Sequence, residues 1–224
     1  MIKQNIPNFL TCLNLTCGLL AIMSGDLDIG VYLVIAGGIF DVFDGMVARA
    51  LNVSSPIGGE LDSLADVVTF GVAPAILYYK AFAGAGQWWF LLGPICIVVA
   101  GAVRLARFNV TESKSNFFEG LAIPASGLTL CGLVYARFFL TGLSLNFLPF
   151  LFIAIGLALL NVSSIKMFSF KQFGSSKVKI YFAVIAGAGL LSLLLMPRLT
   201  IAVLMITYIF LAVINGFFIK ETLS

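Results

Sequence analysis

Residues 41–66 read DVFDGMVARALNVSSPIGGELDSLAD and concentrate four aspartates in a chain that is otherwise largely hydrophobic. On an ideal helix of about 3.6 residues per turn, Asp41 and Asp44 lie within one arc of about 100°. Asp62 and Asp66 are four residues apart, so they stack on one face of the next helix. A short loop rich in Ser, Pro and Gly joins the two helix ends. This stretch therefore predicts a carboxylate cage, formed by the four aspartates, that needs a cation to be stable in a membrane.

The composition indicates an integral membrane protein. The chain has 224 residues, of which 61% are hydrophobic and 10% charged, and its mean hydropathy is +1.10. Only helices and closed barrels satisfy the backbone in lipid, and long unbroken apolar runs exclude the alternation of a barrel. The net charge of +3 is too small to indicate a nucleic-acid partner, and the N-terminus lacks the pattern of a cleaved signal peptide. We expect an all-α, polytopic membrane helical bundle in a single domain, residues 1–224.

Apolar runs predict about eight transmembrane helices. The predicted spans are 10–24, 29–48, 60–82, 86–106, 121–140, 146–163, 180–196 and 199–218. Residues 2–9 are expected to lie at the membrane interface, and residues 52–58 to form the loop between the second and third helices.

The distribution of positive charge predicts the orientation of these helices. Eight spans place both termini on one side, and ten of the 13 Lys and Arg residues then fall on that side. They are Lys3, Arg49, Arg104, Arg107, Lys114, Lys166, Lys171, Lys177, Lys179 and Lys220. Because Lys and Arg are enriched in cytoplasmic segments, this predicts the carboxylate cage at the cytoplasmic ends of helices two and three.

The residue types limit the chemistry. The chain has no histidine, which excludes histidine triads and leaves carboxylates for acid–base work. Carboxylate oxygens without His or Cys suit Mg²⁺ or Mn²⁺, and four carboxylates could bridge two ions. The four cysteines lie in apolar runs without the close spacing of metal ligands, so we interpret them as packing residues: Cys12, Cys17, Cys96 and Cys131.

The aspartates follow the spacing Asp-x2-Asp-Gly-x2-Ala-Arg-x8-Gly-x3-Asp-x3-Asp. This pattern resembles the signature of the CDP-alcohol phosphotransferase family at each fixed position. The resemblance implies that Asp66 is the general base of the reaction. It also implies metal ligands at Asp41, Asp44, Asp62 and Asp66, and contacts with the CDP and pyrophosphate at Asp41, Gly45, Ala48, Arg49, Gly58 and Asp62.

Five further stretches resemble the bacterial phosphatidylserine synthase branch of that family. They are PNFLTCLNLTCGLLAI (7–22), DSLADVVTFGVAPA (62–75), RLARFNV (104–110), FEGLAIPASG (118–127) and VSSIKMFSFK (162–171). The resemblance implies transfer of the phosphatidyl group from CDP-diacylglycerol to the hydroxyl of L-serine, with release of CMP. It further implies a homodimer in the bacterial inner membrane. Small residues in the second and fifth predicted spans would permit close helix packing in such a dimer.

Several polar residues outside the motif have two interpretations. Arg104 and Arg107 could bind the serine carboxylate or a lipid phosphate, or they could anchor the end of the fourth span at the interface. Four others could contact substrates, or could serve as caps and interhelical hydrogen bonds: Asn8, Asn14, Thr69 and Asn109. The basic segment 166–179 is expected to attract anionic lipid headgroups.

Two rival functions remain open. A sibling enzyme would use glycerol 3-phosphate or inositol phosphate, and the extra phosphate of those acceptors would favour a more basic pocket. A transporter would also bury acidic residues, but it would distribute them over the membrane depth and between repeated halves. The clustering of the aspartates at one face favours phosphoryl transfer.

Overall fold

The computed structural model describes residues 2–53, 55–83, 88–110, 118–142, 147–167 and 176–221. The helices are α1 (Ile2–Met23), α2 (Leu27–Leu51), α3 (Pro56–Asp66), α4 (Ala73–Phe82), α5 (Leu92–Val110), α6 (Ile123–Tyr135), α7 (Arg137–Gly142), α8 (Phe147–Val162), α9 (Ser176–Leu195) and α10 (Thr200–Glu221). A π-helical segment, Val67–Val72, joins α3 to α4, and short 3₁₀ turns, Trp88–Leu91 and Pro197–Leu199, precede α5 and α10. The predicted all-α class is confirmed; within the described ranges the sole sheet pairs two-residue strands, β1 (Phe118–Glu119) and β2 (Lys166–Met167).

Five helical stretches are long and apolar enough to cross a membrane. They are Asn5–Met23, Leu27–Leu51, Ile57–Phe82, Trp88–Val110 and Pro197–Gly216. Three predicted spans are shorter apolar helices, Ile123–Tyr135, Leu148–Val162 and Lys179–Leu195, so the count of eight stays a prediction. The expected span 121–140 is divided, because the helix is interrupted at Ala136 between α6 and α7.

Two predicted boundaries differ in the structure. Residues 2–9 form no separate interfacial segment, because they continue directly into α1 with Pro7 inside the helix. The loop expected over 52–58 is shorter, since α3 already begins at Pro56. Ser55 caps this helix by accepting a hydrogen bond from the Gly58 N–H at 2.9 Å, as Ser before a first-turn Pro commonly does. Gly58 therefore belongs to the first turn of α3.

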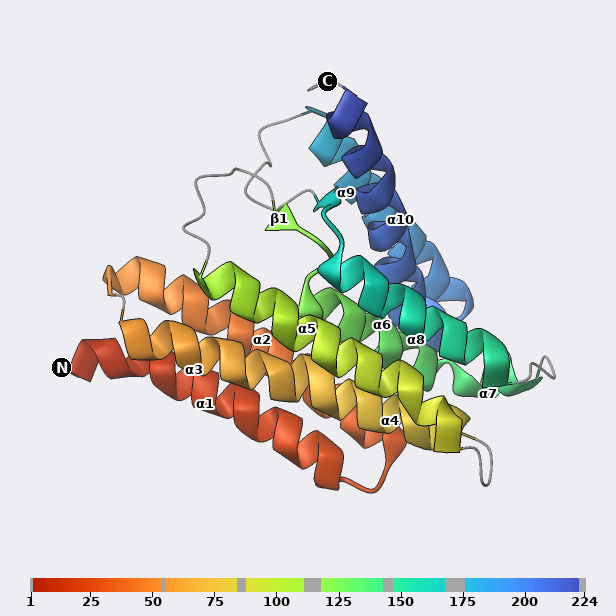
Figure 1. Cartoon of the computed structure of the whole chain (residues 1–224), viewed down its shortest axis with the longest axis horizontal. Coiled ribbons are helices and arrows are strands. Elements are labelled where there is room, and N and C mark those ends of the chain that lie inside the picture. Colours follow the sequence, from red (N-terminus) through yellow and green to blue (C-terminus); the bar gives the residue numbers. More distant parts are fainter. Residues whose placement is uncertain are drawn as a thin grey trace.

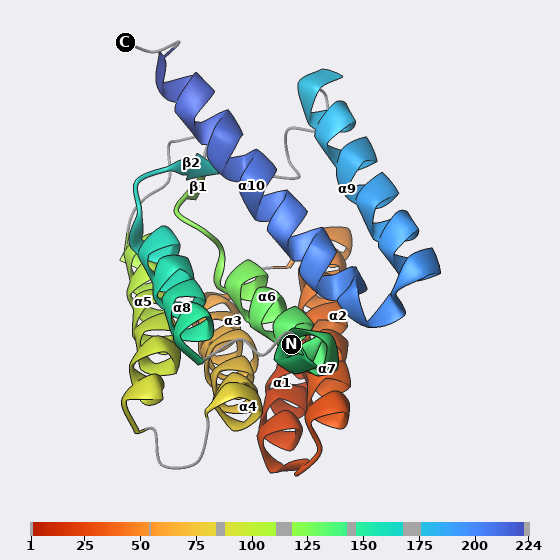
Figure 2. The same ribbon diagram turned by 90° about the vertical axis from the view of Figure 1, so that its right-hand side faces the viewer.

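Helices α1 to α8 form one bundle, and α9 and α10 form a pair beside it (Figures 1 and 2). Helix α1 packs along α2 and α3, while α5 packs along α8. Helix α6 lies between them against α2 and α4. Figure 2 shows α10 crossing α6 and pairing with α9, which stands away from the rest of the bundle. The start of α1, the end of α2, the start of α3 and the end of α5 all lie at one end of the bundle, which is the end that carries the motif.

Close packing inside the bundle depends on glycines and aromatic rings. A Cβ at Gly37 of α2 would come within 2.6 Å of the Thr69 side chain, and one at Gly132 of α6 would come within 2.5 Å of the Ala202 backbone. These small residues of the second and fifth predicted spans therefore serve contacts within the chain. Tyr78 stacks on Phe90 and donates a hydrogen bond to the Phe150 carbonyl at 2.8 Å.

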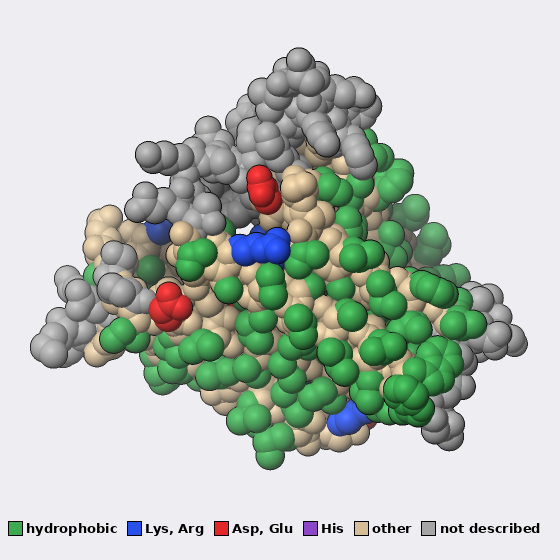
Figure 3. All heavy atoms as spheres, in the orientation of Figure 1, with side chains coloured by type: hydrophobic (Ala, Val, Ile, Leu, Met, Phe, Trp, Pro, Cys, Tyr) green, Lys and Arg blue, Asp and Glu red, His purple; other side chains and the backbone are tan. Residues whose placement is uncertain are grey.

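The outer surface is that of a protein embedded in lipid. Figure 3 shows a broad face covered by hydrophobic side chains, with few charged groups on it. Leu194 and Leu195 of α9 are exposed by 74% and 70%, which lipid tails tolerate and water does not. All four cysteines are free; Cys17 and Cys131 are buried, in agreement with their predicted packing role, whereas Cys12 and Cys96 are exposed. Residues 111–117 and 168–175 lie outside the described ranges, and with them most of the predicted basic segment 166–179.

Candidate active site

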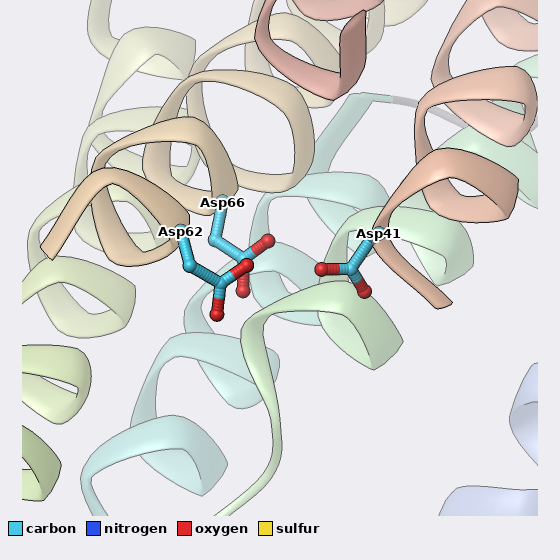
Figure 4. A group of neighbouring side chains, drawn as sticks. All are labelled: Asp41, Asp62 and Asp66. Atoms are coloured by element: carbon cyan, nitrogen blue, oxygen red, sulfur yellow. The ribbon is translucent and has the colours of Figure 1, made fainter. Parts of the chain in front are cut away.

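Three of the four aspartates meet between two helices. Asp41 of α2 faces Asp62 and Asp66, which project together from α3 (Figure 4). One carboxylate oxygen of each residue lies within 4.8 Å of the other two. The predicted stacking of Asp62 and Asp66 one turn apart is thus confirmed. We call Asp41, Asp62 and Asp66 the aspartate trio.

The carboxylates of the trio have no ion-pair partner in the described part of the chain. Asp66 is buried, and Asp41 and Asp62 are half-buried. Oδ1 of Asp62 and Oδ1 of Asp66 are buried and lack a hydrogen-bond partner among the described residues, and no described Lys or Arg forms an ion pair with the trio. Three carboxylates that lie close together, with two buried oxygens free of hydrogen bonds to the described residues, are suitable ligands for a hard divalent cation such as Mg²⁺ or Mn²⁺.

Asp44 lies outside the trio. Its side chain is buried, and one carboxylate oxygen accepts a hydrogen bond from the Thr11 hydroxyl of α1 at 2.6 Å. The structure therefore divides the predicted cage into the trio and a separately held fourth carboxylate. Asp44 nevertheless lines the same cavity as Asp62, so the two parts adjoin.

This cavity has a volume of about 260 Å³ and opens between α1, α2 and α3. Its lining residues are Pro7, Asn8, Thr11, Asp44, Gly45, Ala48, Val53, Ser55, Gly58, Gly59 and Asp62. Four of the six residues predicted to contact the CDP and pyrophosphate come together here: Gly45, Ala48, Gly58 and Asp62. Because Asp62 belongs to both the cavity and the trio, a ligand in the cavity reaches the carboxylates directly.

Small residues keep this cavity open. A Cβ at Gly58 would come within 2.8 Å of Asn8 Oδ1 and 2.9 Å of Ser55 Oγ, so a side chain there would fill the space. Arg49 does not line the cavity. Its guanidinium lies beside Gly45, 3.5 Å from the position a Cβ would take there, and the exposed side chain stands near the rim.

The two arginines of α5 have different surroundings. Arg104 is half-buried, interacts electrostatically with Asp66 and with Tyr208 of α10, and has a buried Nε without a partner among the described residues. Arg107 is exposed, and its Nη1 donates a long hydrogen bond of 3.5 Å to the Val162 carbonyl. The structure thus places Arg104 within electrostatic reach of Asp66.

Two of the polar residues with open interpretations make interhelical hydrogen bonds. Asn109 donates to Ser63 Oγ at 3.0 Å. The Thr69 hydroxyl donates to the Asn14 carbonyl at 3.0 Å. Reasoning from the sequence did not assign Pro7, Thr11 or Ser55 to the site, although the PNFLT segment and the Ser-Pro helix start were available as signals.

Comparisons with known proteins agree with this geometry. A family model described as CDP-alcohol phosphatidyltransferase matches residues 4–162, which contain the trio and the cavity. The chain is 38% identical over 180 residues to the CDP-diacylglycerol–serine O-phosphatidyltransferase of Bacillus subtilis, covering 78% of this chain and 96% of that protein. It is 38% identical over 167 residues to the archaetidylserine synthase of Methanothermobacter thermautotrophicus, covering 72% and 68%. It is 45% identical over 127 residues to the CDP-diacylglycerol–serine O-phosphatidyltransferase of Methanocaldococcus jannaschii, covering 57% and 59%.

Proposed function

The chain belongs to the CDP-alcohol phosphatidyltransferase family, and from this premise we propose that it transfers the phosphatidyl group of CDP-diacylglycerol to the hydroxyl of L-serine and releases CMP. The observation that carries this proposal is the shared position of Asp62, which lines the cavity and belongs to the aspartate trio. A nucleotide held in the cavity would present its pyrophosphate to the trio. The names of the relatives support serine as the acceptor.

The cavity is proposed to bind the CDP portion of the lipid substrate. Gly45, Ala48 and Gly58 expose backbone and let the nucleotide approach closely. Arg49 at the rim can pair with a phosphate oxygen, as guanidinium groups commonly do. The diacylglycerol tails would remain in the surrounding lipid, beside the apolar outer faces of α1 and α2.

Two divalent ions, Mg²⁺ or Mn²⁺, are proposed to be held by Asp41, Asp62 and Asp66, with Asp44 as a further ligand on the cavity side. When bound, such ions neutralise the pyrophosphate and the negative charge that develops on the leaving CMP. The four carboxylates would also hold the positive charge of these ions between the cavity, where the nucleotide is proposed to bind, and the place that the acceptor alcohol would occupy.

Asp66 is proposed as the general base, because it is the most buried member of the trio. Its carboxylate takes the proton of the serine hydroxyl while the hydroxyl oxygen attacks the lipid-side phosphorus. The bond between that phosphorus and the bridging oxygen breaks, and CMP leaves with the oxygen. Arg104 of α5, which lies within electrostatic reach of Asp66, is proposed to bind the serine carboxylate and hold the acceptor beside the base.

The protein is an integral membrane protein of the helical type. We further propose that it functions as a homodimer in the bacterial inner membrane, with the active site facing the cytoplasm. The excess of Lys and Arg that the sequence predicts on the side of the motif supports this orientation. The membrane side of the loop before α3 can be tested by labelling single cysteines introduced at Asn52 in intact and opened cells.

The function is tested by CMP release from the purified protein in detergent. CDP-diacylglycerol and Mn²⁺ or Mg²⁺ are supplied with serine, glycerol 3-phosphate or inositol phosphate in separate reactions, and a CDP-linked ether lipid replaces the diacyl substrate in a parallel series. We expect release with serine alone, and none from Asp66→Asn. Release with a different acceptor would keep the aspartate chemistry and overturn the choice of serine. Folded protein without release in every reaction would overturn phosphatidyl transfer and favour the transporter alternative.

A further inference from the structure

Asn14 of α1 is buried completely, yet neither polar atom of its amide group has a hydrogen-bond partner in the part of the chain that the structure describes. Its side chain is 0% exposed, and both Oδ1 and Nδ2 lack a hydrogen-bond partner among the described residues. Buried polar groups in folded proteins are nearly always hydrogen-bonded, so an unsatisfied amide requires a specific explanation. The reaction proposed above leaves this residue unused.

The amide lies next to the proposed base. Asn14 is close enough to the Asp66 carboxyl to interact with it, while Oδ1 of Asp66 is itself buried and without a partner in the described chain. On the α2 side, a Cβ at Gly37 would come within 3.0 Å of Asn14 Oδ1. The Asn14 amide is therefore within hydrogen-bonding reach of the Asp66 carboxyl, although their contact falls outside normal hydrogen-bond geometry.

The backbone holds these two residues in a fixed relation. The Thr69 hydroxyl donates to the Asn14 carbonyl, and Thr69 lies in the π-helical segment that starts directly after Asp66. A Cβ at Gly18 of α1 would come within 2.5 Å of Thr69 Oγ1, so glycine permits this close approach. Single π-helical turns inside α-helices occur frequently at functional sites.

We propose that Asn14 is a positioning residue for Asp66. Its Nδ2–H group donates to one oxygen of the Asp66 carboxyl once the substrates are bound, which turns the other oxygen toward the acceptor hydroxyl. Catalytic hydrogen bonds are often long in unliganded enzymes and shorten in the substrate complex, which explains the open contact seen here. This inference rests on the proposed function, because it requires Asp66 to act as the base.

The chain offers a matched control in Asn161 of α8. This side chain is also buried, at 1% exposure, but its amide group is hydrogen-bonded to the Ser126 hydroxyl at 3.2 Å. Replacing Asn161 by Leu removes a satisfied structural contact, whereas replacing Asn14 by Leu removes two unsatisfied atoms. Both substitutions replace Asn by Leu, so a difference between their effects on kcat and on unfolding temperature comes from the surroundings of the two residues.

The test compares Asn14→Leu with Asn161→Leu by steady-state kinetics and by thermal unfolding without substrates. For Asn14→Leu we expect kcat to fall about 10- to 100-fold, as for other residues that orient a catalytic group. Its KM for CDP-diacylglycerol should stay within about twofold of wild type, and its unfolding temperature should be unchanged or higher. For Asn161→Leu we expect a lower unfolding temperature and an unchanged kcat. An unchanged kcat in Asn14→Leu, or a fall in kcat that is matched by a lower unfolding temperature, would overturn the proposal.

A second measurement separates this proposal from the choice of acceptor. The Asn14→Leu substitution is repeated in an Asp66→Glu background, and kcat is measured with whichever alcohol the wild-type protein uses. If Asn14 acts through Asp66, the loss caused by Asn14→Leu should be much smaller in that background. Equal losses in both backgrounds would show that Asn14 acts independently of Asp66. Use of an acceptor other than serine would change the substrate assignment and leave this comparison intact.

Discussion

Helix α2 carries Asp28 at its start and Asp41 in its second half, and the surroundings of these two carboxylates are opposite. At its start, the Asp28 carboxylate pairs with Arg137, which is the first residue of α7. It also pairs, at 3.2 Å, with Arg198, which lies in the 3₁₀ turn before α10. In the second half of α2, Asp41 meets two further carboxylates and no described cation within ion-pair distance. Among the described residues, the same residue type on the same helix therefore has ion-pair partners at Asp28 and none at Asp41.

The difference separates a structural role from a functional one. The Asp28 cluster joins α2 to two elements distant in the chain, and Arg198 also stacks over the Tyr135 ring at 5.0 Å. Its charges are balanced within the protein, so it needs no ligand. The trio concentrates like charges in a site of low polarity, which is unfavourable unless a cation enters. The repulsion among these carboxylates lowers the free energy of unfolding of the ion-free protein. The protein tolerates this cost because the site has to bind ions and substrate.

The largest effect is expected from Asp62→Asn, which alters the trio. Activity should fall by at least about 10³-fold, because the substitution removes a ligand of the ions that stabilise the transition state. In divalent-free buffer the variant should be as stable as wild type or more stable, since one repelling charge is removed. Mn²⁺ at about 100 times its Kd should stabilise wild type by about 2.7 kcal/mol, and the variant by much less at the same concentration. Thermal unfolding with and without Mn²⁺ measures this, and equal stabilisation of both proteins would mean that the ion binds elsewhere.

Asp28→Asn alters the ion-paired start of α2, and the expected result is the reverse. The free energy of unfolding should fall by about 1–3 kcal/mol, less than for a fully buried pair because Asp28 and its partners are partly exposed. The kcat of the folded fraction should be unchanged, because the site lies near the other end of α2. Denaturant or thermal unfolding in detergent measures the first expectation and CMP release the second. A fall in kcat without loss of stability would contradict the separation of roles.

Arg104→Lys and Arg107→Lys compare a half-buried cation that interacts electrostatically with Asp66 with an exposed cation on the same helix. The KM for serine should rise about tenfold in Arg104→Lys, because lysine cannot reproduce a bidentate contact with a carboxylate. It should be unchanged in Arg107→Lys, whose side chain is exposed and contacts the end of α8. Serine titrations at saturating CDP-diacylglycerol measure both values. Equal effects in the two variants would favour a general anchoring role for these arginines.

The sequence predicted those parts of the site that depend on local spacing. Asp62 and Asp66 lie on one face of α3 because they are four residues apart, and the short loop brings them opposite Asp41. The separate position of Asp44 was not predicted, because it depends on a hydroxyl 33 residues earlier in the chain. The Asp28 cluster was missed for the same reason, since its arginines are 109 and 170 residues away. Periodicity also did not locate the interruption at Ala136, because apolar residues resume directly after Arg137.

The smallest effects are expected at two helix caps, one beside Asp28 at the start of α2 and one beside the cavity at the start of α3. Asp26 caps α2 by accepting from the backbone N–H groups of Asp28 and Ile29 at 2.8 and 2.9 Å. Ser55 caps α3 by accepting from Gly58, and it also lines the cavity. Replacement of either residue by Ala should cost about 1 kcal/mol of stability.

Only the Ser55 substitution should affect catalysis. Without the cap, the first turn of α3 loosens, and Gly58 no longer holds its position against Asn8 in the cavity wall. The KM for CDP-diacylglycerol should therefore rise severalfold in Ser55→Ala, with kcat nearly unchanged, and both constants should be unchanged in Asp26→Ala. Because the two caps lose similar stability, a difference in KM measures the contribution of the cavity wall alone. Equal KM values in the two variants would mean that the nucleotide does not depend on the first turn of α3.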